Sequence, residues 1–103
     1  MLPRRVLIPI QTFRNHHGRW PTRVIVNTDY VEDEKTRMPE GFWQQLEQRI
    51  KVVYRDDDTF IAEDDRDQVD YDDAVCEETS YEECAETFRW IWGDNWEEKL
   101  RKA

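Results

Sequence analysis

Carboxylates gather in one stretch of this sequence. Residues 56–86 contain fifteen Asp or Glu side chains and a single basic residue, Arg66, which gives a net charge of −14, whereas the whole chain of 103 residues carries −9. Carboxylates can hold a hard cation, exchange protons or attract a positively charged surface. Because like charge at this density opposes compaction, a segment that also keeps apolar side chains is expected to be a folded acidic face that meets positive charge.

Calcium binding is the first specific chemistry to test against this stretch. A calcium loop of the EF-hand type needs oxygen ligands at positions 1, 3 and 5, Gly at position 6 and a Glu at position 12. Counted from Asp65, position 5 is Val69 and position 12 is Cys76; counted from Asp56, position 6 is Ile61. Neither register fits, so the spacing does not predict a calcium site.

Zinc and catalytic motifs are also missing. His16, His17, Cys76 and Cys84 lack the ligand spacings typical of zinc sites. Two cysteines do not make a disulfide framework, although a bond between Cys76 and Cys84 stays conceivable, and a reducing cytoplasm is the expected compartment. The sequence has no nucleophile-elbow, zinc-protease or phosphate-loop motif. We therefore expect no enzyme, no metal and no cofactor.

Alternation inside the acidic stretch gives it a means of docking on the rest of the protein. Val69, Tyr71 and Val75 fall on one side of an extended chain, and Asp70 and Asp72 fall on the other. The stretch is thus either a further strand or a loop pinned by its apolar side.

A row of outward carboxylates in such a strand can imitate nucleic acid. Alternate residues of a strand lie about 6.6–6.8 Å apart, and a DNA strand advances about 3.4 Å per phosphate along its axis. Glu63, Asp65 and Asp67 are therefore a plausible stand-in for a row of phosphates. The full set of candidate partner-binding residues is Glu63, Asp64, Asp65, Asp67, Asp70, Asp72, Asp73, Glu78, Glu82, Glu86 and Trp90.

Periodicity predicts the elements that position these residues. Apolar alternation over 4–13 and 20–31, around a turn at 15–18, predicts an antiparallel hairpin. Pro39 and helical spacing of the apolar residues up to Ile50 predict a helix. Short apolar runs at 51–54 and 59–62 predict a second hairpin.

The last helix is expected to begin at Thr79 or Ser80 and to end at Gly93, with a further turn through residues 94–100. Its buried stripe consists of Tyr81, Cys84, Ala85, Phe88, Ile91 and Trp92. The prediction is one α+β domain over residues 1–103, with helices on one face of a roughly four-stranded antiparallel sheet.

Composition supports a folded chain outside the membrane. Aromatic residues make up 13% of the sequence and include five Trp, and each large ring can bury about 150–250 Å². No stretch approaches the roughly 20 apolar residues of a membrane span. The short segment Met1–Ile10, with its two prolines, is not expected to be a secretory signal.

Charge is divided unevenly along the chain. Residues 1–28 contain five Arg and no acid, while the remainder carries all 24 acidic residues. The basic end is expected either to pair with the acidic residues inside the fold or to make a second contact of its own.

These observations favour a protein-binding module whose acidic face occupies a basic, nucleic-acid-binding groove of a partner protein. The analogy is to small acidic inhibitors of CRISPR or restriction complexes from phages and mobile elements. Direct binding to nucleic acid or membrane is not expected, because the acidic stretch would repel phosphates. Two alternatives stay open: an accessory subunit that docks through its acidic and aromatic C-terminal surface, and a small carboxylate-based enzyme or cation-binding protein.

Overall fold

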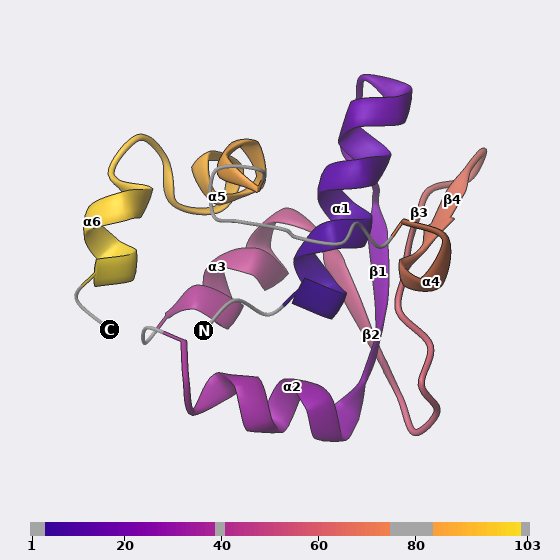
Figure 1. The fold of residues 1–103 in the computed structure, drawn as a ribbon, viewed down its shortest axis with the longest axis horizontal. Coiled ribbons are helices and arrows are strands. Elements are labelled where there is room, and N and C mark those ends of the chain that lie inside the picture. The colour runs from indigo at the N-terminus through magenta and orange to yellow at the C-terminus, as the bar shows by residue number, and fades with distance from the viewer. Residues whose placement is uncertain (1–3, 39–40, 75–83, 102–103) are drawn as a thin grey trace.

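A computed structural model describes residues 4–38, 41–74 and 84–101 of the chain. The fold belongs to the α+β class, as the sequence predicts, and contains a four-stranded sheet (Figure 1). Its elements in chain order are α1 (Arg4–His17), β1 (Arg23–Asn27), α2 (Thr28–Lys35), α3 (Phe42–Arg49), β2 (Lys51–Arg55), β3 (Ile61–Glu63), β4 (Gln68–Asp70), α4 (Tyr71–Ala74), α5 (Ala85–Trp92) and α6 (Trp96–Arg101).

The sheet is mixed, with strand order β2-β1-β3-β4. β1 pairs with β2 in parallel, Val24 opposite Val52, and pairs with β3 antiparallel, Val24 opposite Ala62. Only β3 and β4 form a hairpin among the described strands. The all-antiparallel sheet of two hairpins was therefore a wrong prediction: residues 51–54 and 61–62 are strands, but β1 lies between them.

The first predicted strand, over residues 4–13, is instead part of helix α1. Consecutive residues from Val6 to Ile10 are all buried, so this helix is surrounded by protein on most sides. A continuous apolar run cannot be assigned to helix or strand from its periodicity. The predicted turn at 15–18 is the end of this helix, where Gly18 has φ 71° and its N–H bonds to the Arg14 carbonyl at 3.0 Å.

Of the second predicted strand, over residues 20–31, only Arg23–Asn27 is a strand in the structure, namely β1. The chain enters α2 directly after Asn27, whose side-chain oxygen accepts a 2.8 Å hydrogen bond from the N–H of Tyr30. This is an N-cap, which satisfies a backbone donor that the first helical turn leaves unpaired. The cap ends the strand although the β-type alternation continues to Val31.

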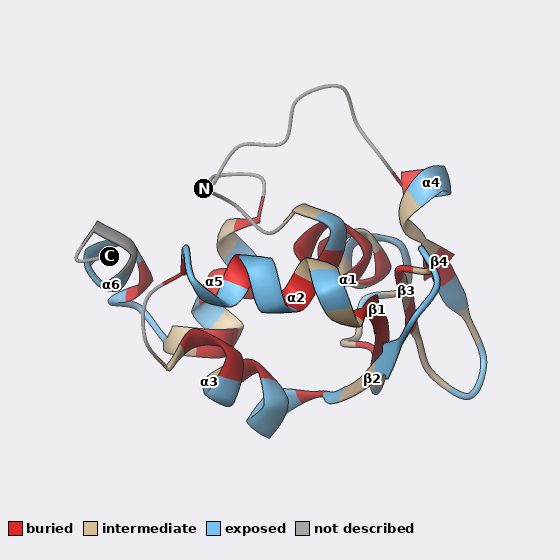
Figure 2. Cartoon of the chain, turned by 90° about the horizontal axis from the view of Figure 1, so that it is seen from below, coloured by how far each residue is buried: buried red, intermediate tan, exposed pale blue. Residues whose placement is uncertain are grey.

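The helices cover one face of the sheet and enclose the core (Figure 2). Helix α1 packs on β1, β3 and β4, and α3 packs beside β2. Val24, Val26 and Ala62 are fully buried on the covered face. Alternation along the strands places Ile25 and its paired neighbours Val53 and Ile61 on the opposite face.

The helices predicted after residue 38 are confirmed where the structure describes them. Helix α3 and the two last helices are present, and α5 ends at Gly93, whose N–H bonds to the Arg89 carbonyl. Cys84, Phe88 and Ile91 are buried as predicted, and Trp96 stacks on Phe88 at 5.1 Å between ring centroids. The predicted start at Thr79 or Ser80, together with Val75, Cys76 and Tyr81, lies outside the described residues.

Across the described ranges, every helix is too short or too polar to cross a membrane.

Candidate protein-interaction surface

The β3–β4 hairpin divides the acidic stretch between its two ends. The turn group comprises Glu63, Asp64, Asp65 and Asp67, at and between the tips of the two strands. The open group comprises Asp56, Asp57, Asp58, Asp70, Asp72 and Asp73, in the β2–β3 loop and around α4.

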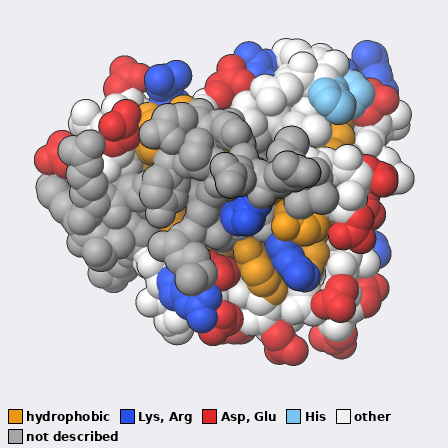
Figure 3. Space-filling view, viewed as in Figure 1, with side chains coloured by type: hydrophobic (Ala, Val, Ile, Leu, Met, Phe, Trp, Pro, Cys, Tyr) orange, Lys and Arg blue, Asp and Glu red, His pale blue; other side chains and the backbone are white. Residues whose placement is uncertain are grey.

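The open group is brought together by strand pairing. Ile61 lies opposite Asp70, and the N–H of Tyr71 bonds to the Phe60 carbonyl at 2.9 Å. These contacts set the last residues of the β2–β3 loop beside the end of β4 and the start of α4, whereas the carbonyls of Asp56 and Asp57 accept hydrogen bonds from Asn27 Nδ2 at the end of β1. Acidic side chains accordingly line that side of the molecule in Figure 3.

Two arginines from the basic N-terminal segment pair with the four carboxylates of the turn group. Arg19 bonds to Asp64 at 2.7 Å through Nε and to Asp67 at 2.6 Å through Nη2. Glu63 and Asp65 lie 3.6 and 3.5 Å from the Arg23 guanidinium, and His17 Nδ1 lies 3.6 Å from Asp67. Part of the basic end thus pairs inside the fold, which was one of the two expectations for it.

Asp64 organises the turn itself. One carboxylate oxygen accepts the backbone N–H groups of Arg66 and Asp67 at 2.8 and 2.9 Å, while the other binds Arg19. The hydrogen bond from Arg19, aided by these backbone donors, holds the pKa of Asp64 far below its ordinary value. The Asp64 side chain is only 11% exposed, so this carboxylate is a structural group of the hairpin.

Replacing Asp64 with Asn is expected to destabilise the protein at neutral pH and to weaken its sensitivity to acid. A carboxylate whose pKa is lowered in the folded state stabilises that state fully above its ordinary pKa of 3.8. The contribution is lost as the pH falls from there towards and through the lower folded-state pKa. Urea denaturation from pH 7 down to about pH 2.5 measures both effects.

The matched control for this experiment is Asp65→Asn, which removes the same charge from a side chain that is 94% exposed. Its free energy of unfolding should change little at any pH, because exposed ion pairs contribute about 0–1 kcal/mol. Equal acid sensitivity of Asp64→Asn and the wild type would show that the Arg19 pairing does not stabilise the fold.

The open group has no such partners. Among the described residues, none of its six carboxylates lies within ion-pair distance of a cation. The side-chain bonds that it does make are local, from Thr59 N–H to Asp57 and from Asp72 N–H to Asp70. Within the part of the chain that the structure describes, the exposed side chains of Asp56, Asp58, Asp72 and Asp73 make no hydrogen bond or ion pair.

An aromatic cluster that periodicity does not predict lies beside the open group. The rings of Tyr30, Phe60 and Tyr71 surround the guanidinium of Arg5, with centroids 5.9, 5.5 and 5.7 Å from Cζ. The Arg5 backbone N–H also donates to Tyr30 Oη at 3.3 Å, and burial raises the pKa of Tyr30 to about 12. Because Tyr71 stands between Asp70 and Asp72, charge and aromatic surface are contiguous (Figure 3).

The remaining predicted residues lie on α5 or outside the described residues. Glu86 accepts a 3.2 Å hydrogen bond from Gln11 and lies 3.5 Å from Arg14, so it is tied to α1. Trp90 is half-buried and stacks flat on Trp20 at 4.2 Å, which makes it a packing residue more than an exposed anchor. Glu78 and Glu82 lie outside the described residues.

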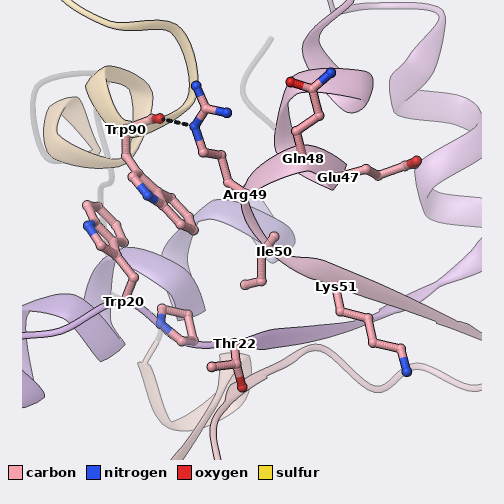
Figure 4. Close-up of a pocket in the computed structure, with 9 residues that line it drawn as sticks. Trp20, Thr22, Glu47, Gln48, Arg49, Ile50, Lys51 and Trp90 are labelled. Carbon is pink, nitrogen blue, oxygen red and sulfur yellow. Dashed lines mark hydrogen bonds between the residues drawn. The ribbon is translucent and has the colours of Figure 1, made fainter.

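The stacked pair Trp20 and Trp90 forms one wall of an open pocket of about 520 Å³ (Figure 4). Arg49 closes part of it by donating from Nε to the Trp90 carbonyl at 2.9 Å. The other lining residues are Pro21, Thr22, Glu47, Gln48, Ile50 and Lys51.

No family model matches this chain, and neither a curated protein nor a solved structure matches it. Within the described ranges, no three His, Cys, Asp or Glu side chains are grouped so that they could hold a metal ion. What the geometry provides is a set of unneutralised carboxylates beside aromatic rings. Such a surface attracts cationic groups and offers them hydrogen-bond acceptors.

Proposed function

We propose that this protein is a binding module that inserts its open acidic group into a basic, nucleic-acid-binding groove of a partner protein. One observation carries the proposal: among the described residues, the six carboxylates of the β2–β3 loop, the end of β4 and α4 have no cation within ion-pair distance. Their mutual repulsion is relieved when Lys and Arg side chains of a partner approach. In this role the module competes with nucleic acid and inhibits the partner.

The acidic residues assigned to the partner here are not the ones that the sequence suggested. The row of Glu63, Asp65 and Asp67 lies beside Arg19 and Arg23, so its charge is largely satisfied within the protein. The open group keeps its charge for a partner.

The aromatic cluster supports a protein partner. Tyr is enriched among the residues that dominate binding energy at protein interfaces. Tyr71 is half-buried between open-group aspartates and fits that description. Complementary charge also accelerates association and selects against wrong partners.

Capture from a cell lysate, followed by competition, tests the proposal. The bait is the wild-type protein. A variant bait replaces four exposed residues of the open group, Asp56, Asp58, Asp72 and Asp73, with Asn. We expect the wild-type bait to retain nucleic-acid-binding proteins at about 0.1 M salt, to lose them at about 0.5 M salt, and to release them when duplex DNA or RNA is added. The variant should retain at least about tenfold less.

A second variant serves as the matched control by removing four charges elsewhere. It carries Glu32→Gln, Asp94→Asn, Glu97→Gln and Glu98→Gln, all at exposed positions, and should capture the same proteins as the wild type. If both variants lost the captured proteins equally, the effect would come from net charge and not from the open group. Partners that added nucleic acid does not displace would contradict groove occupation.

A further inference from the structure

Strand β2 forms one edge of the sheet that the described residues build. The Lys51 N–H bonds to the Thr22 carbonyl at 3.1 Å, on the side of β1. Residues of a parallel ladder alternate between bonding to the neighbour and pointing away from it. Lys51, Val53 and Arg55 therefore bond to β1, while the backbone N–H and C=O groups of Val52 and Tyr54 point to the open edge.

This edge is positively charged in a protein that is strongly negative. Residues 49–55 contain Arg49, Lys51 and Arg55 and no acid. On the sheet face without a helix, Lys51 lies beside Arg23 of β1, since these residues are paired. An extended segment that pairs with β2 would thus meet cations at both of its ends.

Side-chain alternation defines what such a segment must carry. Lys51, Val53 and Arg55 occupy one face of β2, and Val53 is half-buried between the two cations. Directly opposed side chains of paired strands lie about 4.5–5.5 Å apart, where opposite charges attract. The matching segment therefore has two acids four residues apart, with an apolar residue midway between them.

The other face of the same edge is nearly neutral. Tyr54 is 40% exposed, donates to Glu47 at 2.8 Å, and has Lys35 Nζ 5.8 Å from its ring centroid. Lys35 Nζ also lies 3.5 Å from Glu32, so Glu32, Glu47 and Lys35 leave no excess of positive charge there. Selection by charge is thus confined to the face that carries Lys51 and Arg55.

The tryptophan-walled pocket continues the edge at its first residue. Ile50 and Lys51 belong both to its lining and to the start of β2, with Trp20 and Trp90 across from them (Figure 4). A segment that runs past Lys51 would place one further side chain in this pocket. An apolar side chain fits the two flat rings, and edge protection by Lys and Arg alone does not require such a pocket.

We propose that β2 is a docking edge for an acidic, extended segment of a partner protein, which adds to the sheet as a further strand. Backbone hydrogen bonds to Val52 and Tyr54 supply affinity, as in other cases of strand addition. Charge pairing with Lys51 and Arg55 supplies selectivity. This site has the opposite charge to the open acidic group, whose Asp56 directly follows Arg55 in the chain.

The probe for this site is a fluorescein-labelled peptide with the sequence Leu-Thr-Glu-Thr-Val-Thr-Glu-Thr, and the measurement is fluorescence anisotropy with the full chain. Two further peptides carry N-methyl groups on alternate residues, one on each of the two alternate sets. A strand directs only one set of its amides to its neighbour. We therefore expect one methylated peptide to lose binding and the other to keep it; equal behaviour of the two would overturn strand addition.

Charge reversal identifies the edge that is used. Lys51→Glu with Arg55→Glu should weaken peptide binding by at least about tenfold, while the control Arg89→Glu with Lys99→Glu, which makes the same change in net charge at exposed positions of α5 and α6, should bind normally. Amide NMR shifts on titration should concentrate at residues 50–55. Equal loss in the control, shifts elsewhere, or self-association that fills the edge without peptide would each contradict the proposal.

Discussion

Phe88→Ala is expected to lower the free energy of unfolding by about 3–5 kcal/mol, the cost of emptying a buried Phe site. Phe88 is fully buried at the centre of α5. Its ring stacks between Trp92 and Trp96, at centroid distances of 6.0 and 5.1 Å, and lies 6.4 Å from Phe42. Rigid rings on several sides cannot collapse into the space that the substitution leaves.

A loss of that size is a large part of the total, because domains of this length are stable by about 5–15 kcal/mol. Urea denaturation followed by tryptophan fluorescence measures it. Tyr54→Ala is the control, since Tyr54 is 40% exposed and its removal should cost far less. A loss below about 1 kcal/mol for Phe88→Ala would mean that α5 does not pack tightly against α3 and α6.

Local signals predicted the elements that have local causes. Helix α3 shows apolar residues at helical spacing, and Gly93 ends α5 with φ 84°, a backbone angle that glycine adopts easily. Val69 is buried and anchors β4, so the acidic stretch does contain a further strand, but this strand ends at Asp70, and Tyr71 begins helix α4 where alternation predicted an extended chain.

Errors arose where tertiary burial replaces periodicity. The run Val6–Ile10 is apolar at every position because α1 passes through the core, and such a run reads equally well as strand or helix. With that segment misassigned, Val24 of β1 had no correct partner. Its parallel pairing with Val52 joins residues far apart in sequence, and no turn signal specifies it.

The sequence predicts the negative charge of the candidate site but not which of its carboxylates are paired with cations. Composition shows that residues 56–86 are acidic, yet it does not show that Arg19 would claim Asp64 and Asp67 while Asp72 stays unpaired. The cluster around Arg5 assembles from separate segments of the chain, and single-sequence periodicity carries no information on such contacts.

Gln11→Leu is expected to cost about 2–4 kcal/mol, because it leaves buried hydrogen-bond donors unsatisfied at about 1–3 kcal/mol each. Gln11 is buried on α1, and its Oε1 accepts both the backbone N–H of Thr87 at 3.0 Å and the Thr87 hydroxyl at 2.8 Å. Thr87 itself is fully buried on α5. Nε2 of Gln11 also donates to Asn15 and Glu86, so the amide of Gln11 joins the two helices.

A double-mutant cycle with Thr87→Val isolates this contact. The double variant has no hydroxyl at residue 87 that could be left without an acceptor. We therefore expect its loss of free energy of unfolding to be smaller than the sum of the losses for Gln11→Leu and Thr87→Val measured separately. The backbone N–H of residue 87 lacks an acceptor whenever Gln11→Leu is present, with or without Thr87→Val. This part of the loss in stability therefore remains in the double variant. Additive effects would show that Gln11 and Thr87 do not interact, and that α5 is held on α1 by apolar packing alone.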